Sequence, residues 1–375
     1  MSSTLSSTLS SSFDSPLDRP LDSVVIGAGQ AGLSTSYHLA RRGVDHVVLD
    51  ADASPGGAWQ HRWDSLSMDD VHGIAALPGA ERPDPPGGER ANEAVPAYFA
   101  DYEAAHDLPV LRPVPVDRVV DGIGAEAGLL VVHAGTRRWA TRTLVNATGT
   151  WSQPFVPSYP GAASFGGEQL HTHDYPGPEH FRARRTLVVG GGTSAVQLLG
   201  EIAPVTDTLW VTRRPPVWRT DDFTPEVGRA AVALVEERVR RGLPPASVVS
   251  VTGLALREQE RVAEELGAYR RRPMFSAIEP DGVRWDDGER EGVDVILWAT
   301  GFRPAITHLA PLHLRSKHGG ITLDGTTAVA DQRVQLVGYG PSASTIGANR
   351  AGRLAARRVA QSLARASRAG ASVSA

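Results

Sequence analysis

The sequence predicts an α/β protein built from two similar units in which strands and helices alternate. Three observations predict this fold class. A glycine-rich turn follows a short apolar strand near residue 27, another follows an apolar strand near residue 190, and each leads into a helical stretch and a further apolar strand. Such alternation is typical of parallel sheets covered by helices. We therefore expect two Rossmann-like domains that bind dinucleotides.

The composition excludes several kinds of chemistry. The 375 residues, 41% of them apolar, are enough for two domains with separate cores. Because the sequence has no cysteine, thiol nucleophiles, iron–sulfur clusters and disulfide reductases are excluded. The net charge of -4 comes without a basic block interleaved with aromatic residues, so we expect no nucleic-acid partner.

The first twenty residues differ in composition from the rest. Residues 1–20 are rich in serine and threonine and lack the basic and apolar regions of a signal peptide, so we expect a disordered tail. No apolar run approaches the length of a membrane span, so we expect no membrane partner and take the cytoplasm as the default location. The sequence leaves the oligomeric state open, a homodimer included.

The first unit carries the pattern G-x-G-x-x-G between a strand and a helix. The first glycine allows a tight turn, the second lets the backbone approach a pyrophosphate, and the third lets the helix pack on the strand. The helix N-terminus then faces the phosphates. Asp50 ends the next strand, where a carboxylate can accept hydrogen bonds from ribose hydroxyls. The residues assigned to this cofactor site are Gly27, Gly29, Gln30, Ala31, Gly32 and Asp50.

The second unit repeats this arrangement with the opposite charge at its end. An arginine pair stands where the first unit has an acid, at the same distance from the first glycine. An acid suits a bare ribose and arginines suit a 2′-phosphate, so we expect FAD at the first site and NADPH at the second. The alternative for the arginines is a solvated surface pair. The residues assigned to this second site are Gly190, Gly192, Thr193, Ser194, Arg213 and Arg214.

Two Ala-Thr-Gly turns, one near residue 149 and one near residue 301, end apolar strands on either side of the second unit. The economical arrangement is therefore an NADPH-binding domain inserted into a FAD-binding domain. The cofactor residues assigned to these turns are Thr148, Gly149, Thr300 and Gly301. The expected boundaries are 21–155 and 300–375 for the two parts of the FAD-binding domain and 156–299 for the NADPH-binding domain.

A helical insertion is expected at 221–275, within the second domain. Thr224 is a good helix cap and is followed by proline in the first turn. The insertion is predicted either to cover the substrate or to pack on the NADPH-binding domain. The last helix carries Ala351, Ala355 and Val359 at helical spacing, which indicates a packing face.

The stretch FGGEQLHTHDY stands between the two units. Its Phe165, Gly167, His171 and Tyr175 match the fingerprint of the class B flavin-dependent monooxygenases, which include flavin-containing monooxygenases, YUCCA enzymes, N-hydroxylases and Baeyer–Villiger enzymes. The sequence resembles this group, as a compact bacterial member, over nearly its whole length. The resemblance implies that His171 belongs to the interdomain linker beside the nicotinamide nucleotide. A metal site at His171 and His173 lacks an identified third ligand, so no metal is expected.

The resemblance also implies roles for the stretch that follows the first unit. Gly57, Ala58 and Trp59 match a flavin-contacting turn of the family. Where flavin-containing monooxygenases place an asparagine near the reactive edge of the flavin, this chain has Asp69 and, three residues later, His72. These two are the candidate catalytic residues, and the alternative is that both are surface loop residues.

The activity that the resemblance implies is an NADPH-dependent monooxygenase. NADPH would reduce FAD, dioxygen would add to flavin C4a, and the resulting hydroperoxide would transfer one oxygen atom to a nitrogen or sulfur centre of a small molecule. Ketone oxidation is not favoured, because the arginine of Baeyer–Villiger enzymes has no match. The alternatives are a FAD-dependent NADPH oxidase or ferredoxin-type reductase, and a redox-sensing flavoprotein that binds both nucleotides.

Overall fold

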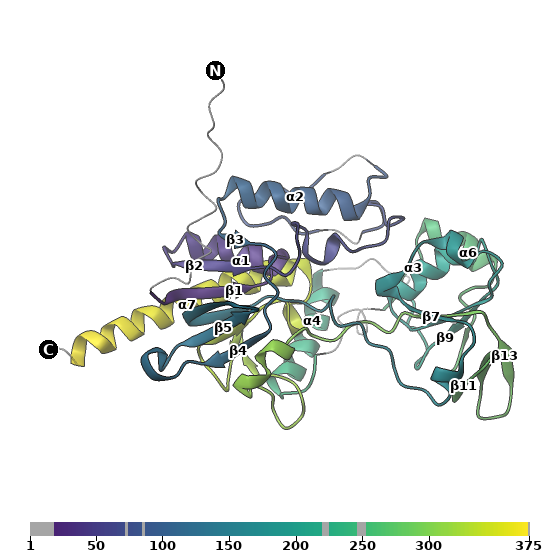
Figure 1. Ribbon diagram of the computed structural model, residues 1–375. Helices are drawn as coiled ribbons and strands as arrows, with labels where there is room; N and C mark the ends of the chain where they lie inside the picture. Colours follow the sequence, from purple (N-terminus) through teal and green to yellow (C-terminus); the bar gives the residue numbers. More distant parts are fainter. Residues whose placement is uncertain (1–18, 72–73, 85–86, 220–224, 246–252, 374–375) are drawn as a thin grey trace, which may run out of the picture.

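The computed structural model describes residues 19–71, 74–84, 87–219, 225–245 and 253–373. Two α/β bodies lie next to each other (Figure 1), each built on its own sheet with parallel strands. The first body takes its strands from before residue 147 and after residue 320, and the second takes its strands from between them. The predicted fold class is thus confirmed. All but the last two residues of the predicted tail lie outside the described residues.

The first body is built on a nine-stranded sheet. Its centre is five parallel strands in the order β17-β6-β1-β2-β3, in which Val25 pairs with Val48 on one side and Val145 on the other. These valines are fully buried, as expected for a parallel sheet covered on both faces. The five strands are β1 (Leu21–Ile26), β2 (His46–Leu49), β3 (Val110–Leu111), β6 (Arg137–Asn146) and β17 (Val334–Leu336).

Helices cover one face of this sheet and strands and turns cover the other. On the helical face, Leu33, Phe99 and Ala355 share one core with the sheet, and α1 packs along α7. Beyond the five central strands, β5 and β4 continue the sheet antiparallel from β6, and β16 and β15 extend its far edge beyond β17; the core on the other face includes Val119 of β4 and Leu323 of β15. The elements are α1 (Gln30–Ala40), α2 (Ala91–Ala105), α7 (Thr345–Val373), β4 (Arg118–Asp121), β5 (Leu130–Ala134), β15 (Leu323–Asp324) and β16 (Thr327–Ala328).

The second body has a five-stranded, fully parallel sheet in the order β10-β9-β8-β14-β7. Helices α3 and α6 lie on one face of it, and an antiparallel sheet of β11, β12 and β13 lies on the other. The elements are β7 (Glu168–His171), β8 (Thr186–Val189), β9 (Thr208–Val211), β10 (Arg271–Arg272), β14 (Val295–Trp298), α3 (Thr193–Ile202), α6 (Arg261–Glu265), β11 (Ala277–Glu279), β12 (Gly282–Arg284) and β13 (Arg290–Gly292).

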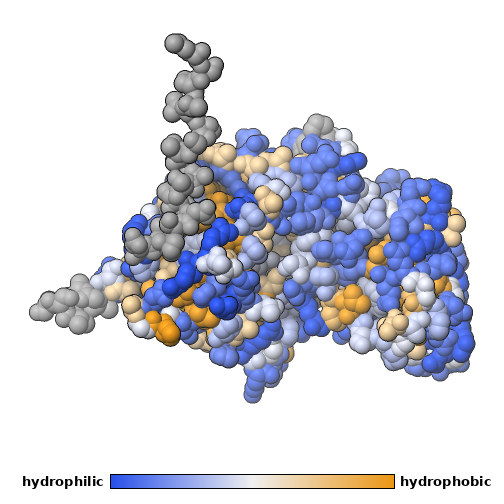
Figure 2. All heavy atoms as spheres, viewed as in Figure 1, coloured by the Kyte–Doolittle hydropathy of each residue, from blue (hydrophilic) through white to orange (hydrophobic). Residues whose placement is uncertain are grey.

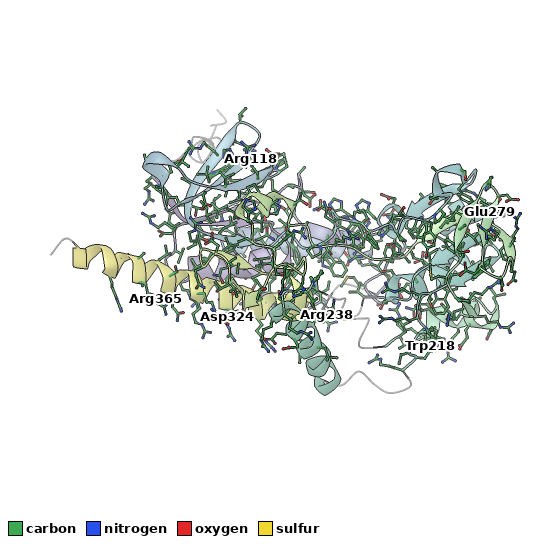
Figure 3. All side chains as sticks on the ribbon, turned by 90° about the horizontal axis from the view of Figure 1, so that it is seen from below. Arg118, Trp218, Arg238, Glu279, Asp324 and Arg365 are labelled. Atoms are coloured by element: carbon green, nitrogen blue, oxygen red, sulfur yellow. The ribbon has the colours of Figure 1, made fainter. Side chains whose placement is uncertain are left out.

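The predicted insertion at 221–275 does not form one unit on the second body. Its helix α4 (Pro225–Arg240) packs against the first body, because Val239 joins the core that contains Leu309 and Tyr339. Figure 3 shows Arg238 of α4 beside the first body, whereas Trp218 lies in the second. Among the described residues of the insertion, it is the later part, with α6, that packs on α3. The proposed cap, Thr224, lies outside the described residues.

Apart from the excursion that brings α4 to the first body, the chain passes between the bodies at residues 149–155 and again at 301–305, and these two crossings run together as a short antiparallel pair. Backbone hydrogen bonds join Phe155 N to Gly301 O at 3.0 Å, Arg303 N to Gln153 O at 2.8 Å, and Ala305 N to Gly149 O at 2.9 Å. Both Ala-Thr-Gly turns lead into these crossings.

The surface is mostly polar. Figure 2 shows a largely hydrophilic face on which apolar residues gather only in separate small groups. Among the described residues, no helix has both the length and the hydropathy needed to cross a membrane.

Candidate active site

The first glycine turn joins β1 to α1 with very close backbone packing. A Cβ atom added to Gly27, whose φ is +98°, would lie 2.7 Å from the carbonyl oxygen of Ala147, so only glycine fits there. Gly29 is the N-cap of α1 and provides no side-chain hydrogen bond to the first turn of the helix. The amides of that turn therefore remain available to bind an anion.

A cavity of about 610 Å³ opens beside this turn. Its walls come from the first glycine turn, the end of β2, the turn after it, both crossings and the start of α7. Gly57 brings the 57–59 turn into place, because an added Cβ would lie 2.9 Å from Gly29 Cα. Ten of the predicted cofactor residues line this single cavity: Gly27, Gly29, Gln30, Ala31, Asp50, Gly57, Ala58, Trp59, Thr148 and Gly149.

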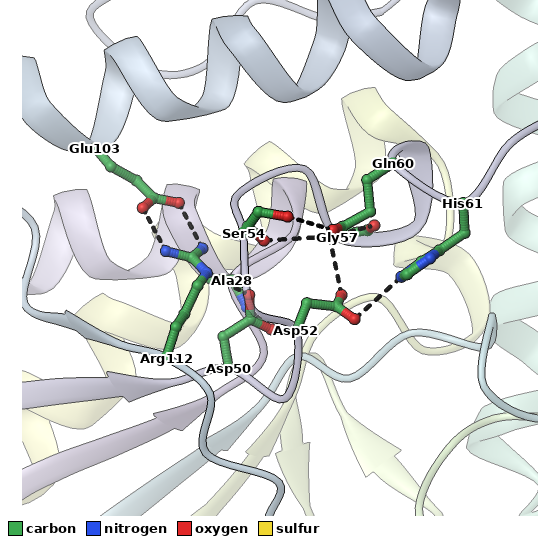
Figure 4. A network of polar contacts seen from close by, with 9 residues as sticks. All are labelled: Ala28, Asp50, Asp52, Ser54, Gly57, Gln60, His61, Glu103 and Arg112. Atoms are coloured by element: carbon green, nitrogen blue, oxygen red, sulfur yellow. Dashed lines mark hydrogen bonds and ion pairs between the residues drawn. The ribbon is translucent and has the colours of Figure 1, made fainter.

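Asp50 lines the cavity as part of an ion-pair network that the sequence analysis did not anticipate (Figure 4). Its carboxylate accepts hydrogen bonds from Ala28 N at 3.3 Å and Arg112 Nε at 2.9 Å, and Arg112 binds both carboxylate oxygens of Glu103 at 2.6 and 2.7 Å. Burial raises the pKa of Asp50, and the Arg112 guanidinium opposes that rise. No local pattern marks Arg112, which lies 62 positions beyond Asp50.

Three buried side-chain atoms at this cavity have no hydrogen-bond partner among the described residues. They are Gln30 Oε1, Arg62 Nε and Trp151 Nε1. Because buried polar atoms are nearly always hydrogen-bonded, they indicate a polar ligand with both donors and acceptors. A flavin dinucleotide, with its phosphates, ribityl hydroxyls and ring carbonyl and imide groups, fits this set.

The second glycine turn repeats the backbone plan of the first. A Cβ on Gly190, whose φ is +146°, would lie 2.1 Å from the carbonyl oxygen of Ala299. Gly192 is the N-cap of α3, again without a side-chain cap, so Thr193 and Ser194 begin the helix with free first-turn amides. The end of β9 lies beside the turn, because an added Cβ on Gly191 would lie 3.6 Å from the Thr212 side chain.

The two predicted 2′-phosphate ligands follow β9 directly. Arg213 and Arg214 are exposed, and neither forms an ion pair with another described residue. Thr300 and Gly301 follow β14, and the Thr300 hydroxyl donates to the carbonyl of Phe155 in the crossing. These residues lie in the second body and its crossings, apart from the cavity described above.

His171 lies at the crossings, where both of its ring nitrogens bond to the protein. Nδ1 accepts from His173 N at 3.0 Å, so Nε2 carries the proton and donates to Gly301 O at 3.1 Å. Burial lowers the pKa of His171, which favours the neutral ring that this pattern requires. Its ring nitrogens therefore position the crossing strand and are not free to bind a nucleotide.

The structure places Asp69, which is predicted to lie at the reactive edge of the flavin, away from the cavity. Asp69 is exposed, accepts a hydrogen bond from Gly88 N at 2.9 Å and does not line the cavity. The physical reason is local: its loop pairs with the 87–90 loop through Met68 N and Glu89 O at 2.8 Å. The other candidate, His72, lies outside the described residues.

A partly buried acid that the sequence analysis missed joins the two bodies. Glu201 on α3 accepts hydrogen bonds from Trp63 Nε1 at 3.1 Å, Ser65 Oγ at 2.5 Å and Tyr175 OH at 3.1 Å. Burial raises the pKa of Glu201. The last aromatic residue of the fingerprint, Tyr175, is thus part of a contact between the second body and the loop after the 57–59 turn.

Comparisons with known proteins agree with this geometry. The family model described as pyridine nucleotide-disulphide oxidoreductase matches residues 21–339. A solved flavin-containing monooxygenase from Stenotrophomonas maltophilia is 37% identical, with a TM-score of 0.79 over 92% of this chain and 99% of that chain.

Two curated relatives are more distant. An uncharacterized oxidoreductase, CzcO, of Bacillus subtilis (strain 168) is 25% identical over 75% of this chain and 81% of its own. Indole-3-pyruvate monooxygenase YUCCA1 of Oryza sativa subsp. japonica is 28% identical over 75% of this chain and 76% of its own.

The family follows from the first two matches, which span most of the chain. The disulphide chemistry in the family description needs cysteines, and this sequence has none. The resemblance found in the sequence is confirmed: the chain belongs to the pyridine nucleotide-disulphide oxidoreductase family and, within it, to the flavin-containing monooxygenases, and is therefore a flavin-dependent oxidoreductase.

Proposed function

We propose that this chain is an NADPH-dependent monooxygenase that binds FAD in the cavity of the first body and inserts one oxygen atom into a nitrogen or sulfur centre of a small molecule. The observation that carries the proposal is the set of three unpaired buried atoms around a cavity that begins at a glycine turn. The membership in the flavin-containing monooxygenases supports the same assignment.

In this proposal the chain holds each nucleotide by the same means. The uncapped amides of α1 bind the pyrophosphate of FAD, and the uncapped amides of α3 bind that of NADPH. Asp50 has acceptor capacity left for a ribose hydroxyl of FAD. Arg213 and Arg214 bind the 2′-phosphate of NADPH, for which guanidinium groups are well suited.

When bound, FAD supplies the redox chemistry: it accepts a hydride from NADPH and delivers one atom of dioxygen. NADPH, a proton, dioxygen and the substrate give NADP⁺, water and the oxygenated substrate, so no other reductant is needed. The chain has to exclude water from the reacting centre. Trp151, which stacks on Phe302 with ring centroids 4.9 Å apart, borders the cavity at the crossings and contributes to this exclusion.

The proposal is tested by measuring which product receives the electrons of NADPH. The purified protein, loaded with FAD, is given NADPH, air and either methyl phenyl sulfide or N,N-dimethylaniline, and sulfoxide, N-oxide and hydrogen peroxide are quantified against the NADPH consumed. We expect most of the NADPH to appear as oxygenated product with at least one probe. Full recovery of the electrons as hydrogen peroxide with every probe would identify an NADPH oxidase instead.

A further inference from the structure

Arg62, just after the 57–59 turn, is a partly buried cation without a counter-ion among the described residues. Its guanidinium carbon lies 4.6 Å from the ring centroid of Trp151 and 5.6 Å from that of Trp59. None of the described carboxylates forms an ion pair with it, and its Nε has no hydrogen-bond partner. Burial lowers the pKa of Arg62 only to about 10, so the side chain stays charged at neutral pH.

This arrangement is unusual because a buried charge is costly unless it is paired. The two indole rings stabilise the cation only in part. A nearby arginine shows the ordinary case: Arg90 has Asp64 at 3.7 Å and Glu93 at 3.4 Å. The charge of Arg62 is therefore left for an anion that the described part of the chain does not supply.

Arg62 stands where two hollows meet. It lines the 610 Å³ cavity and also a more open hollow of about 540 Å³, whose walls are residues 61–65 and Arg90 of the first body and residues 175–179 of the second. Arg62 is therefore within reach of a molecule that lies between the bodies as well as of one in the cavity.

The nucleotides already have sites for their own charges. Each pyrophosphate has an uncapped helix N-terminus, at α1 or α3, and the 2′-phosphate of NADPH has the exposed arginines after β9. The anion that remains is one carried by the substrate. The planar guanidinium presents parallel N–H donors that match the two oxygens of a carboxylate.

We propose that Arg62 binds the carboxylate of the substrate, so that the substrates are aromatic organic acids that carry the oxidisable nitrogen or sulfur. The ring faces of Trp59 and Trp151 beside the guanidinium suit an aromatic group next to that carboxylate. The unpaired Trp151 Nε1 is a second donor available to it. This inference names the substrate class of the proposed monooxygenase and rests on that function.

The test uses two probes of nearly the same shape, one of them charged and the other neutral. (Phenylthio)acetic acid and (phenylthio)acetamide carry the same thioether, and both are titrated into the FAD-loaded protein without NADPH while the flavin absorbance is followed. Because a charge-assisted hydrogen bond is about twice as strong as a neutral one, we expect the acid to bind roughly tenfold to a hundredfold more tightly than the amide. Equal affinities in the unmodified protein would overturn the proposal without any variant.

Variants of Arg62 test whether this side chain causes the preference for the acid. Arg62→Met should remove the preference for the acid and leave the affinity for the amide within about threefold, and Arg62→Lys should retain part of the preference because it keeps the charge but loses the planar fork. Arg41→Met is the control and should keep the preference, because Arg41 also lies over an aromatic ring, that of Tyr37 at 5.7 Å, but lines neither hollow. If Arg62→Met slows flavin reduction by NADPH without changing either probe affinity, Arg62 serves a cofactor and the proposal is wrong.

Measuring both binding and turnover distinguishes a failure of this inference from a failure of the proposed function. Under NADPH and air, the ratio of sulfoxide to hydrogen peroxide is measured with the acid. A tightly bound acid that yields only hydrogen peroxide would support the role of Arg62 and contradict the monooxygenase. Sulfoxide formed equally well from the acid and the amide would support the monooxygenase and contradict the role of Arg62.

Discussion

In the first body the glycine turn leads to an acid whose charge is already compensated, whereas in the second body the equivalent turn leads to uncompensated arginines. The backbone plan is shared: Gly27 packs on the carbonyl of Ala147, and Gly190 packs on that of Ala299. The side chains at the strand ends differ. Asp50 is buried against Arg112, while Arg213 is exposed without an ion pair among the described residues.

This difference teaches how one backbone plan can serve two kinds of nucleotide binding. A network that is complete before the ligand arrives needs little rearrangement, which suits a resident cofactor. Exposed cations are fully hydrated until a phosphate arrives, which suits a co-substrate that must leave after each turnover. Four experiments test and sharpen this contrast.

The largest effect is expected in the first body, from Arg112→Met. The variant leaves Asp50 and Glu103 without their cation, and breaking a buried ion pair from one side costs about 3 to 5 kcal/mol. Burial already raises the pKa of Asp50 above 3.8, so its ionisation costs stability as the pH climbs past that value, and the loss of Arg112 enlarges that cost. Urea unfolding should therefore show a greater loss at about pH 8 than at about pH 5.

The control for this variant is Arg142→Met. Arg142 pairs with Asp22 at 3.3 Å, and both side chains are partly exposed, so its removal should cost less than about 1 kcal/mol at either pH. A similar loss in both variants would mean that the ion pairs around Asp50 contribute no more to the stability of the first body than an exposed ion pair does.

The next prediction compares the third position of the glycine pattern in the two turns, which is Gly32 in the first and Ala195 in the second. A Cβ on Gly32 would lie 1.8 Å from the carbonyl oxygen of Gly27, whereas Ala195 of the second turn already carries a Cβ in a fully buried position. Gly32→Ala should cost about 3 kcal/mol and empty the FAD site, because the turn must open. Ala195→Gly should cost only about 1 kcal/mol. Thermal unfolding and the flavin-to-protein absorbance ratio measure both.

In the second body, Arg213→Ala should change nucleotide choice and leave stability unaltered. The lost contact to a 2′-phosphate amounts to about 1.5 to 3 kcal/mol, which weakens NADPH binding roughly tenfold to a hundredfold. NADH binding should hardly change, since NADH lacks that phosphate. Equal losses of both nucleotides in steady-state titrations would show that Arg213 is a general surface cation.

The smallest effect concerns the contact between the bodies. Glu201→Gln replaces an acceptor of three hydrogen bonds by an amide that can accept through one oxygen only, at a cost of about 1 kcal/mol. The exposed Glu179, which pairs with Arg182, provides the control variant Glu179→Gln. We expect calorimetry to resolve the two bodies better in Glu201→Gln. An unchanged single transition would show that the crossings alone couple them.

The sequence predicted those features that depend on neighbouring residues. Both strand–turn–helix units were found because glycine spacing and apolar strands are local signals, and β1, α1, β8 and α3 lie where those signals place them. The identity of the family was also readable, because the fingerprint residues stand within one short stretch.

The sequence could not predict contacts between distant segments. Arg112 reaches Asp50 only because β3 lies beside β2, and Val239 of α4 enters the first core through a tertiary contact that no periodicity indicates. The contact that holds the loop of Asp69 is of the same kind, since Gly88 N donates to the Asp69 carboxylate from a separate loop. Arg62 was overlooked because an arginine between two tryptophans of separate loops has no sequence pattern.

The discontinuous sheet of the first body also determines the order in which the protein is completed on the ribosome. The strand β6 pairs with β1 and β5, which are translated before it, but its remaining partner, β17, is translated only after the whole second body. The second body can thus close while the first still exposes part of β6 and the face of α1 that α7 later covers. The domain that is begun first is finished last, which reverses the usual N-terminal-first sequence of folding during synthesis.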